Sequence, residues 1–154
     1  MSPRRLNMQL FCIPGTSRMS LDVWPHLPLL IKGHVDDISV DNFIAELEHS
    51  DRIRLFHLDC FCEPSELENL WIAMQVPFPE LATLYLSCGD SEPDVPVLPD
   101  SFLGGSAPRL RYFELNGIPF SGFPKVLLFA THLVTLGLRN IPSHPRRRPL
   151  ASPC

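Results

Sequence analysis

The sequence predicts an α/β fold: a right-handed solenoid fragment with parallel strands on the concave side and short helices or 3-10 turns on the convex side. The first observation is an internal repeat: residues 110–120 read LRYFELNGIPF and residues 133–143 read LVTLGLRNIPS. The second is the pattern L-x-x-L-x-L, which occurs four times. One short strand with one helix cannot cover its own apolar face, so such units stack on their neighbours.

The four copies of the pattern define the predicted strands. Their middle anchors Phe56, Leu84, Phe113 and Leu136 are 28, 29 and 23 residues apart, within the leucine-rich-repeat period of about 20 to 29 residues. The anchors should face the core and the residues between them the opposite side, because side chains alternate along a strand. The full anchor sets are Ile53, Phe56 and Leu58; Leu81, Leu84 and Leu86; Leu110, Phe113 and Leu115; and Leu133, Leu136 and Leu138.

Two weaker copies precede these four. One is RRLNMQLF, with Met8 and Leu10 at strand spacing, and the other is the apolar run Leu29 to Ile31, which Gly33 ends. The first predicted helix, VDNFIAEL over 40–47, follows this run and has apolar residues on one stripe.

The second predicted helix lies in LENLWIAMQ, over 67–75. Ser65 and Glu68 form a capping box ahead of it, and Pro77 and Pro79 should stop it. Its buried face is expected to hold Leu67, Leu70, Trp71 and Met74.

Two shorter connections complete the chain. LPDSFLGGSAPRL, over 98–110, contains two adjacent glycines and predicts no more than one turn of helix. Pro124 stands at a favourable first-turn position for a last helix over Val126 to Ala130.

Composition limits the possible functions. With 45% hydrophobic residues and 19% charged residues the chain can bury a core. A net charge of −4 gives no overall basic field, so nucleic acid and membrane are not expected partners. The odd count of 5 cysteines argues for reduced thiols and a cytoplasmic or nuclear protein.

The predicted binding face consists of the outward positions of the four strands. It holds Leu55, His57 and Asp59; Thr83, Tyr85 and Ser87; Tyr112, Glu114 and Asn116; and Thr135, Gly137 and Arg139. A solenoid makes such a face extended and suited to a protein or peptide. Tyr85 and Tyr112 would be rigid aromatic anchors, and Asp59, Glu114 and Arg139 would supply charge selectivity. The alternative is that these residues are only the polar side of amphipathic strands.

An enzymatic function is not expected, and neither is a metal or a cofactor. Cys60 lies beside His57 and Asp59 in sequence but points to the other side of the strand, so neither residue could activate its thiol. The C-x-C spacing of Cys60 and Cys62 is shorter than zinc sites usually have. A small cysteine- or metal-dependent enzyme is the less favoured alternative.

Five stretches, 2–12, 21–33, 41–53, 73–86 and 97–142, together resemble the leucine-rich-repeat region of F-box-like proteins of mushroom-forming (basidiomycete) fungi, and the last stretch is specific. The resemblance implies the substrate-binding repeat region of an F-box-like ubiquitin-ligase receptor. In that family an F-box precedes the SPRRL-like segment, so residues 1–20 would be a leading strand after a missing F-box.

Residues 21–142 would then form a solenoid of about five repeats, and 143–154 a disordered tail rich in Pro and Arg. Without the F-box, binding to a Skp-type adaptor is not expected. A truncated or degenerate gene product without independent function is the alternative, and its uncapped end predicts marginal stability.

Overall fold

The computed structural model describes residues 28–36, 40–89, 95–120, 122 and 124–142. The predicted leading segment 1–20, with Met8 and Leu10, and the predicted tail 143–154 lie outside the described residues.

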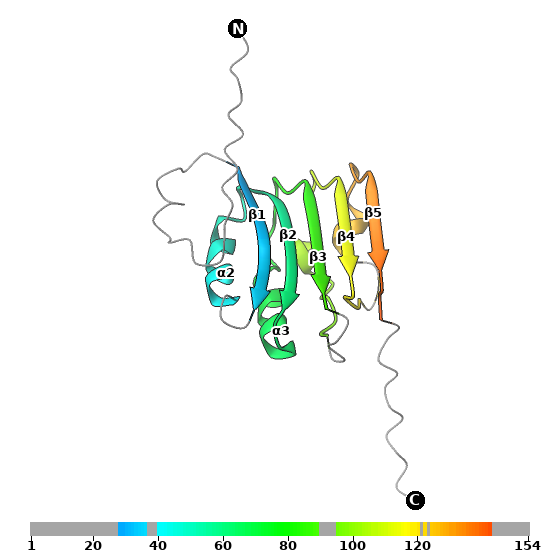
Figure 1. Cartoon of the computed structure of the whole chain (residues 1–154). Coiled ribbons are helices and arrows are strands. Elements are labelled where there is room, and N and C mark those ends of the chain that lie inside the picture. The colour runs from blue at the N-terminus through cyan, green and yellow to red at the C-terminus, as the bar shows by residue number, and fades with distance from the viewer. Residues whose placement is uncertain (1–27, 37–39, 90–94, 121, 123, 143–154) are drawn as a thin grey trace, which may run out of the picture.

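A five-stranded parallel sheet forms the centre of the structure (Figure 1). Its strands are β1 (Leu29–Asp36), β2 (Ile53–Phe61), β3 (Thr83–Cys88), β4 (Tyr112–Asn116) and β5 (Thr135–Arg139). They lie side by side in chain order, and every neighbouring pair is parallel. Among the described residues β1 and β5 are therefore the two edges of an open sheet. The predicted α/β class with parallel strands is confirmed.

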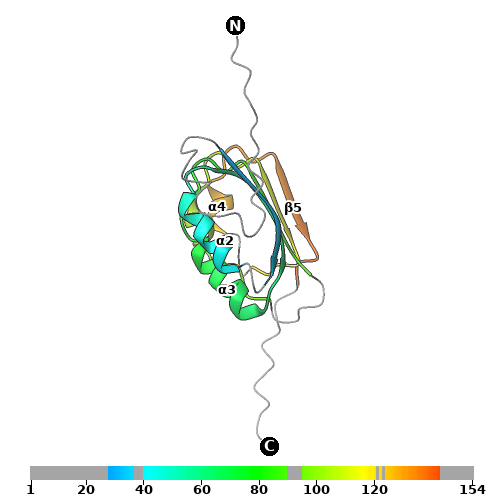
Figure 2. The same ribbon diagram turned by 60° about the vertical axis from the view of Figure 1, so that its left-hand side comes forward.

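Short helices connect the strands. They are α2 (Val40–Glu46), which continues into the 3-10 turn η1 (Leu47–His49), then α3 (Pro64–Ala73), the 3-10 turn η2 (Phe102–Gly105) and α4 (Lys125–Leu128). Figure 2 shows α2, α3 and α4 on the same side of the sheet. This follows from the topology, because parallel neighbours need a crossover and crossovers of one hand return over one face.

The four middle anchors form one row across the sheet, as predicted. Phe56 pairs with Leu84, Leu84 with Phe113 and Phe113 with Leu136. The first three side chains are fully buried, whereas Leu136 on the edge strand is 45% exposed. Alternation thus directs all four toward the helices, but the last has a neighbour on one side only among the described strands.

The strand at Leu29 to Ile31 is confirmed, but its predicted end at Gly33 is wrong. β1 continues to Asp36 because β2 is nine residues long and offers it a partner at every position, up to the pair of Asp36 with Phe61. Backbone pairing with a long neighbour outweighs the modest cost of one glycine inside a strand.

The predicted face of α3 is buried: Leu67, Leu70 and Trp71 are at most 3% exposed, and Met74, the C-cap residue directly after the helix, is fully buried. The indole Nε1–H of Trp71 donates a hydrogen bond to the carbonyl oxygen of Pro96 at 3.1 Å. The predicted capping box is wrong: the helix begins at Pro64, and its N-cap residue Glu63 makes no side-chain capping bond. Proline has a pre-set φ suited to the first helical position, so the helix starts ahead of Ser65.

The connection over 98–110 has the single 3-10 turn η2, in keeping with the prediction. Leu103, Gly104 and Gly105 have positive φ there. A Cβ on Gly104 would lie 2.8 Å from the backbone nitrogen of Pro77. The lack of a side chain at Gly104 therefore allows this turn to pack against Pro77, in the segment between α3 and β3. The last helix, α4, covers Lys125–Leu128 and so ends two residues before the predicted Ala130.

Candidate functional site

All eight predicted site residues lie on adjacent strands, on the side of the sheet opposite the helices. We call this side the open face. Pairing registers arrange it in three rows, which are Leu30, Leu55, Thr83, Tyr112 and Thr135; Lys32, His57, Tyr85, Glu114 and Gly137; and His34, Asp59, Ser87, Asn116 and Arg139. The alignment follows from the repeat itself, because equal spacing between anchors gives parallel strands the same register.

The aromatic part of the open face is the pair His57 and Tyr85. Their ring centroids are 4.2 Å apart with planes inclined by 33°, and both residues are half-buried. Each ring limits the rotation of the other, so together they present a stiff patch of apolar and polar area.

The β1 edge adds residues that the sequence interpretation missed. His34 Nδ1 lies 3.5 Å from Asp59 Oδ2, and Lys32 is exposed beside His57. The signal that could have found them is the alternation that continues past Gly33, which places Leu30, Lys32 and His34 on one side of the strand.

Glu114 lies in the middle of the open face and is 5% exposed. Its carboxylate accepts a hydrogen bond from the Tyr112 hydroxyl and is 3.1 Å from Arg139 Nε. The hydrogen bond to Glu114 raises the pKa of Tyr112 above its ordinary value. Both carboxylate oxygens of Glu114 thus have partners within the chain, and its role in charge selectivity stays a prediction.

Gly137 explains why Glu114 can be buried on an otherwise half-exposed face. A Cβ at Gly137 would stand 2.9 Å from Glu114 Cγ and 3.1 Å from its Cδ. The Glu114 side chain thus lies over the bare backbone of β5. Arg139, which lies on β5 like Gly137 and has a side chain that is 71% exposed, neutralises the Glu114 carboxylate.

A polar chain follows the carboxyl ends of β3 to β5. Asn140 Nδ2 donates to Asn116 Oδ1 at 3.0 Å, and Asn116 Nδ2 donates to Ser87 Oγ at 3.4 Å. The predicted residues Ser87 and Asn116 are therefore joined, and their orientation is set by one another.

The thiols lie on the other side of the sheet. Cys60, Cys62 and Cys88 are buried, and Cys60 pairs with Cys88 across β2 and β3. The hydrogen bond with Cys88 and burial hold the pKa of the Cys60 thiol well above its usual 9.0. Cys60 is thus a protonated, weakly nucleophilic core residue, on the side opposite His57 and Asp59 as predicted.

Two further observations concern metal and membrane. In the part of the chain that the structure describes, three or more His, Cys, Asp or Glu side chains never gather in a way that could hold a metal ion. The described helices lack the length and apolar character needed to cross a membrane.

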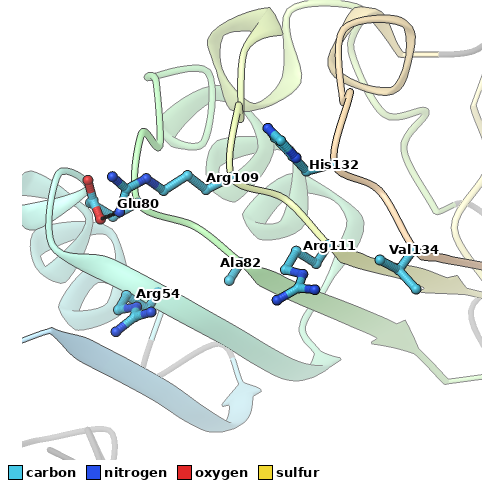
Figure 3. A pocket seen from close by; sticks show the side chains of 7 residues that line it. All are labelled: Arg54, Glu80, Ala82, Arg109, Arg111, His132 and Val134. Carbon is cyan, nitrogen blue, oxygen red and sulfur yellow. Dashed lines mark hydrogen bonds and ion pairs between the residues drawn. The ribbon is translucent and has the colours of Figure 1, made fainter. Parts of the chain in front are cut away.

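A second polar surface, at the amino ends of the strands, was missed by the sequence interpretation. A hollow of about 410 Å³ is lined there by Arg54, Glu80, Ala82, Arg109, Arg111, His132 and Val134 (Figure 3). We call it the amino-edge hollow. The signal in the sequence is the residue directly after the first anchor of each repeat: Arg54, Ala82, Arg111 and Val134.

Comparison with protein-family models, with curated proteins and with solved structures finds no match to this chain.

Proposed function

We propose that the chain is a non-catalytic recognition module whose open face binds a protein or peptide partner. The observation that carries the proposal is the register of the sheet, which aligns polar and aromatic side chains of five strands on the side opposite the helices. Such a face is long, continuous and half-exposed. These are properties of a surface that reads a polymer rather than a small substrate.

The His57 and Tyr85 pair is the proposed anchor of the interface. Aromatic residues dominate interface energetics when they are central and held in place, and this pair lies in the middle row, with β1 on one side and β4 on the other. Its stacked rings lose little side-chain freedom on binding, which lowers the entropic cost of association.

Two side-chain pairs flank the anchor, one toward each edge of the sheet. His34 with Asp59 lies toward the β1 edge, and Arg139 with Glu114 places opposite charges toward the β5 edge. Because the His34 and Arg139 side chains are 72% and 71% exposed, they would act as a rim that favours a partner of matching charge pattern.

We further propose that the sheet is part of a leucine-rich-repeat solenoid. The repeat period, the one-sided helices and the uninterrupted register from β2 to β5 support a leucine-rich-repeat solenoid. With the resemblance to F-box-like proteins, they support a role as the substrate-binding repeat region of a ubiquitin-ligase receptor in the cytoplasm or nucleus.

The experiment is a selection of binding peptides from a displayed random library, followed by calorimetric titration of the best binders. Tyr85→Ala should weaken binding at least tenfold, as truncation of an anchor does. Ile72→Ala on α3 is the matched control, because Ile72 is 59% exposed and lies on a helix away from the open face. Binders that lose no affinity with Tyr85→Ala and His57→Ala would contradict the proposal.

A product without independent function is the second candidate, and one observation favours it. The β5 side exposes apolar residues, with Val134 at 73%, Leu136 at 45% and Leu138 at 37%. Such an edge invites aggregation. This candidate predicts no cooperative unfolding transition, whereas a recognition module should remain monomeric in gel filtration and melt cooperatively within the usual mesophile range of about 45 to 65 °C.

A further inference from the structure

We propose that the amino-edge hollow is a second binding site, which takes a phosphate monoester dianion carried by a side chain of a partner protein. It is distinct from the open face and does not depend on it. The strand beginnings and the loops before them build the hollow (Figure 3), whereas the open face is built from the alternating positions farther along the same strands.

The charge of the hollow comes from three arginines, one at the start of β2 and two in the segment directly before β4. Arg54, Arg109 and Arg111 contribute three positive charges and Glu80 one negative charge, which leaves about two positive charges on a chain whose net charge is −4. A phosphate monoester carries between one and two negative charges near pH 7. It would therefore neutralise the hollow more completely than a carboxylate would.

Arg54 and Arg111 are the proposed phosphate ligands. Neither side chain has an ion pair or hydrogen bond with another described residue, in contrast to Arg109, whose Nη1 is 2.8 Å from Glu80 Oε2. Guanidinium groups present paired N–H donors that match phosphate oxygens, and two of them can grip one phosphate from two sides.

The backbone fixes the distance between these two arginines. The Ala82 amide donates to the Arg54 carbonyl at 2.8 Å, and the Arg111 amide donates to the Ala82 carbonyl at 2.9 Å. Arg54 and Arg111 thus lie on either side of Ala82, about 10 Å apart at the backbone, given the usual strand spacing. The single methyl group of Ala82 leaves room between them for a tetrahedral anion.

The rest of the hollow indicates what carries the phosphate. Its volume of about 410 Å³ exceeds the size of one phosphate group, and Val134 adds an apolar wall. His132 on the facing loop supplies a further ring nitrogen (Figure 3). A phosphate on an amino-acid side chain would fill this space with its own chain and flanking residues.

The first test follows backbone amide signals by NMR during titration with inorganic phosphate and with N-acetyl-phosphoserine amide. The expected result is shifts centred on Arg54, Ala82 and Arg111 with both probes, and tighter binding of the phosphoserine probe. Shifts scattered over the surface would overturn the proposal.

The second test measures affinity for a fluorescent peptide with one phosphoserine between randomised flanks. The Arg54→Gln and Arg111→Gln double variant should bind at least tenfold more weakly, whereas Lys125→Gln, which removes one exposed charge from α4, should stay within twofold. Circular dichroism establishes that the variants are folded. Equal losses in the double variant and in Lys125→Gln would overturn the site.

Further arms separate phosphate from other anions and from the open face. The peptide with Ser or Glu in place of phosphoserine should bind at least tenfold more weakly, and binding should weaken with added salt because the arginines are exposed. Equal binding of a single-stranded DNA oligomer would overturn the proposal in favour of nucleic acid. Tyr85→Ala should retain phosphopeptide binding, so failure of the open-face proposal and failure of this one remain distinguishable.

Discussion

The same substitution at two positions of one row should have unequal effects on stability. Leu84 and Leu136 occupy the same place in their repeats, and Phe113 lies between them in the register. Leu84 is fully buried, and Leu136 is 45% exposed. Because both changes are Leu→Ala, the chemistry and the effect on the unfolded chain are closely matched.

The magnitudes follow from burial. Leu84→Ala removes a fully buried side chain and leaves a cavity, which costs about 2 to 5 kcal/mol. Complete burial of a leucine stabilises by about 1.5 to 3 kcal/mol, so a position that is about half exposed should lose about 1 kcal/mol on truncation, without an enclosed cavity.

Urea denaturation followed by tryptophan fluorescence and far-UV circular dichroism measures both losses. Leu84→Ala should lower the unfolding free energy by at least about 1 kcal/mol more than Leu136→Ala, a difference of about 2 to 4 °C or more in Tm for a chain of this length. Equal losses would refute the placement of β5 at an exposed edge, because they would mean that Leu136 is covered in solution.

The other predictions concern single side chains and use the same unfolding assay. Burial raises the pKa of Glu46 from 4.5 to about 7, so the folded state holds this proton more tightly than the unfolded chain does, and stability falls as pH rises from about 4.5 to 7. Glu46→Gln should therefore stabilise by about 1 to 2 kcal/mol at pH 8, allowing for solvent screening, and by little at pH 4.5; an equal gain at both values would contradict the burial effect. Gly117→Ala should cost about 1 to 3 kcal/mol, because φ is +72° and the new Cβ would lie 2.7 Å from the Cys88 carbonyl oxygen. Gly122→Ala, with open space around it, is the control and should change stability by less than about 0.5 kcal/mol. Trp71→Phe should cost about 1 kcal/mol or more through the lost indole hydrogen bond, and an unchanged midpoint would show that this bond contributes nothing.

The strand positions could be predicted because the repeat encodes them directly. Equal offsets between Leu81, Leu84 and Leu86 and their counterparts place a strand at the same point of each repeat, and parallel strands placed in this way pair in register. The buried face of α3 was predictable for a similar reason, since its apolar residues follow the helical period.

The properties that sequence reasoning missed depend on neighbours far away in the chain. Glu114 can be buried because Gly137 on the next strand has no side chain. The residues around Glu114 in the sequence give no indication of this burial. The amino-edge hollow likewise needs Arg54 and Arg111 to flank Ala82, which becomes visible once β2, β3 and β4 are placed side by side.

The helix start shows a competition between two local signals. Ser65 and Glu68 match a capping box, yet the N-cap residue is Glu63 and the helix begins at Pro64, two residues earlier than a Ser65 cap would place it. A fixed φ acts on the backbone itself, whereas a capping hydrogen bond contributes only about 1 kcal/mol and must still be formed.

The unbroken register from β2 to β5 gives the open face a regular spacing across its strands, and this spacing differs from the residue spacing of an extended peptide. Across the strands, equivalent side chains recur about every 4.8 Å, while an extended peptide repeats about every 3.4 Å. A peptide lying across the sheet would come back into phase after about three strands and four of its own residues, about 14 Å. The face would therefore read such a ligand at widely separated positions and leave the residues between them free to vary.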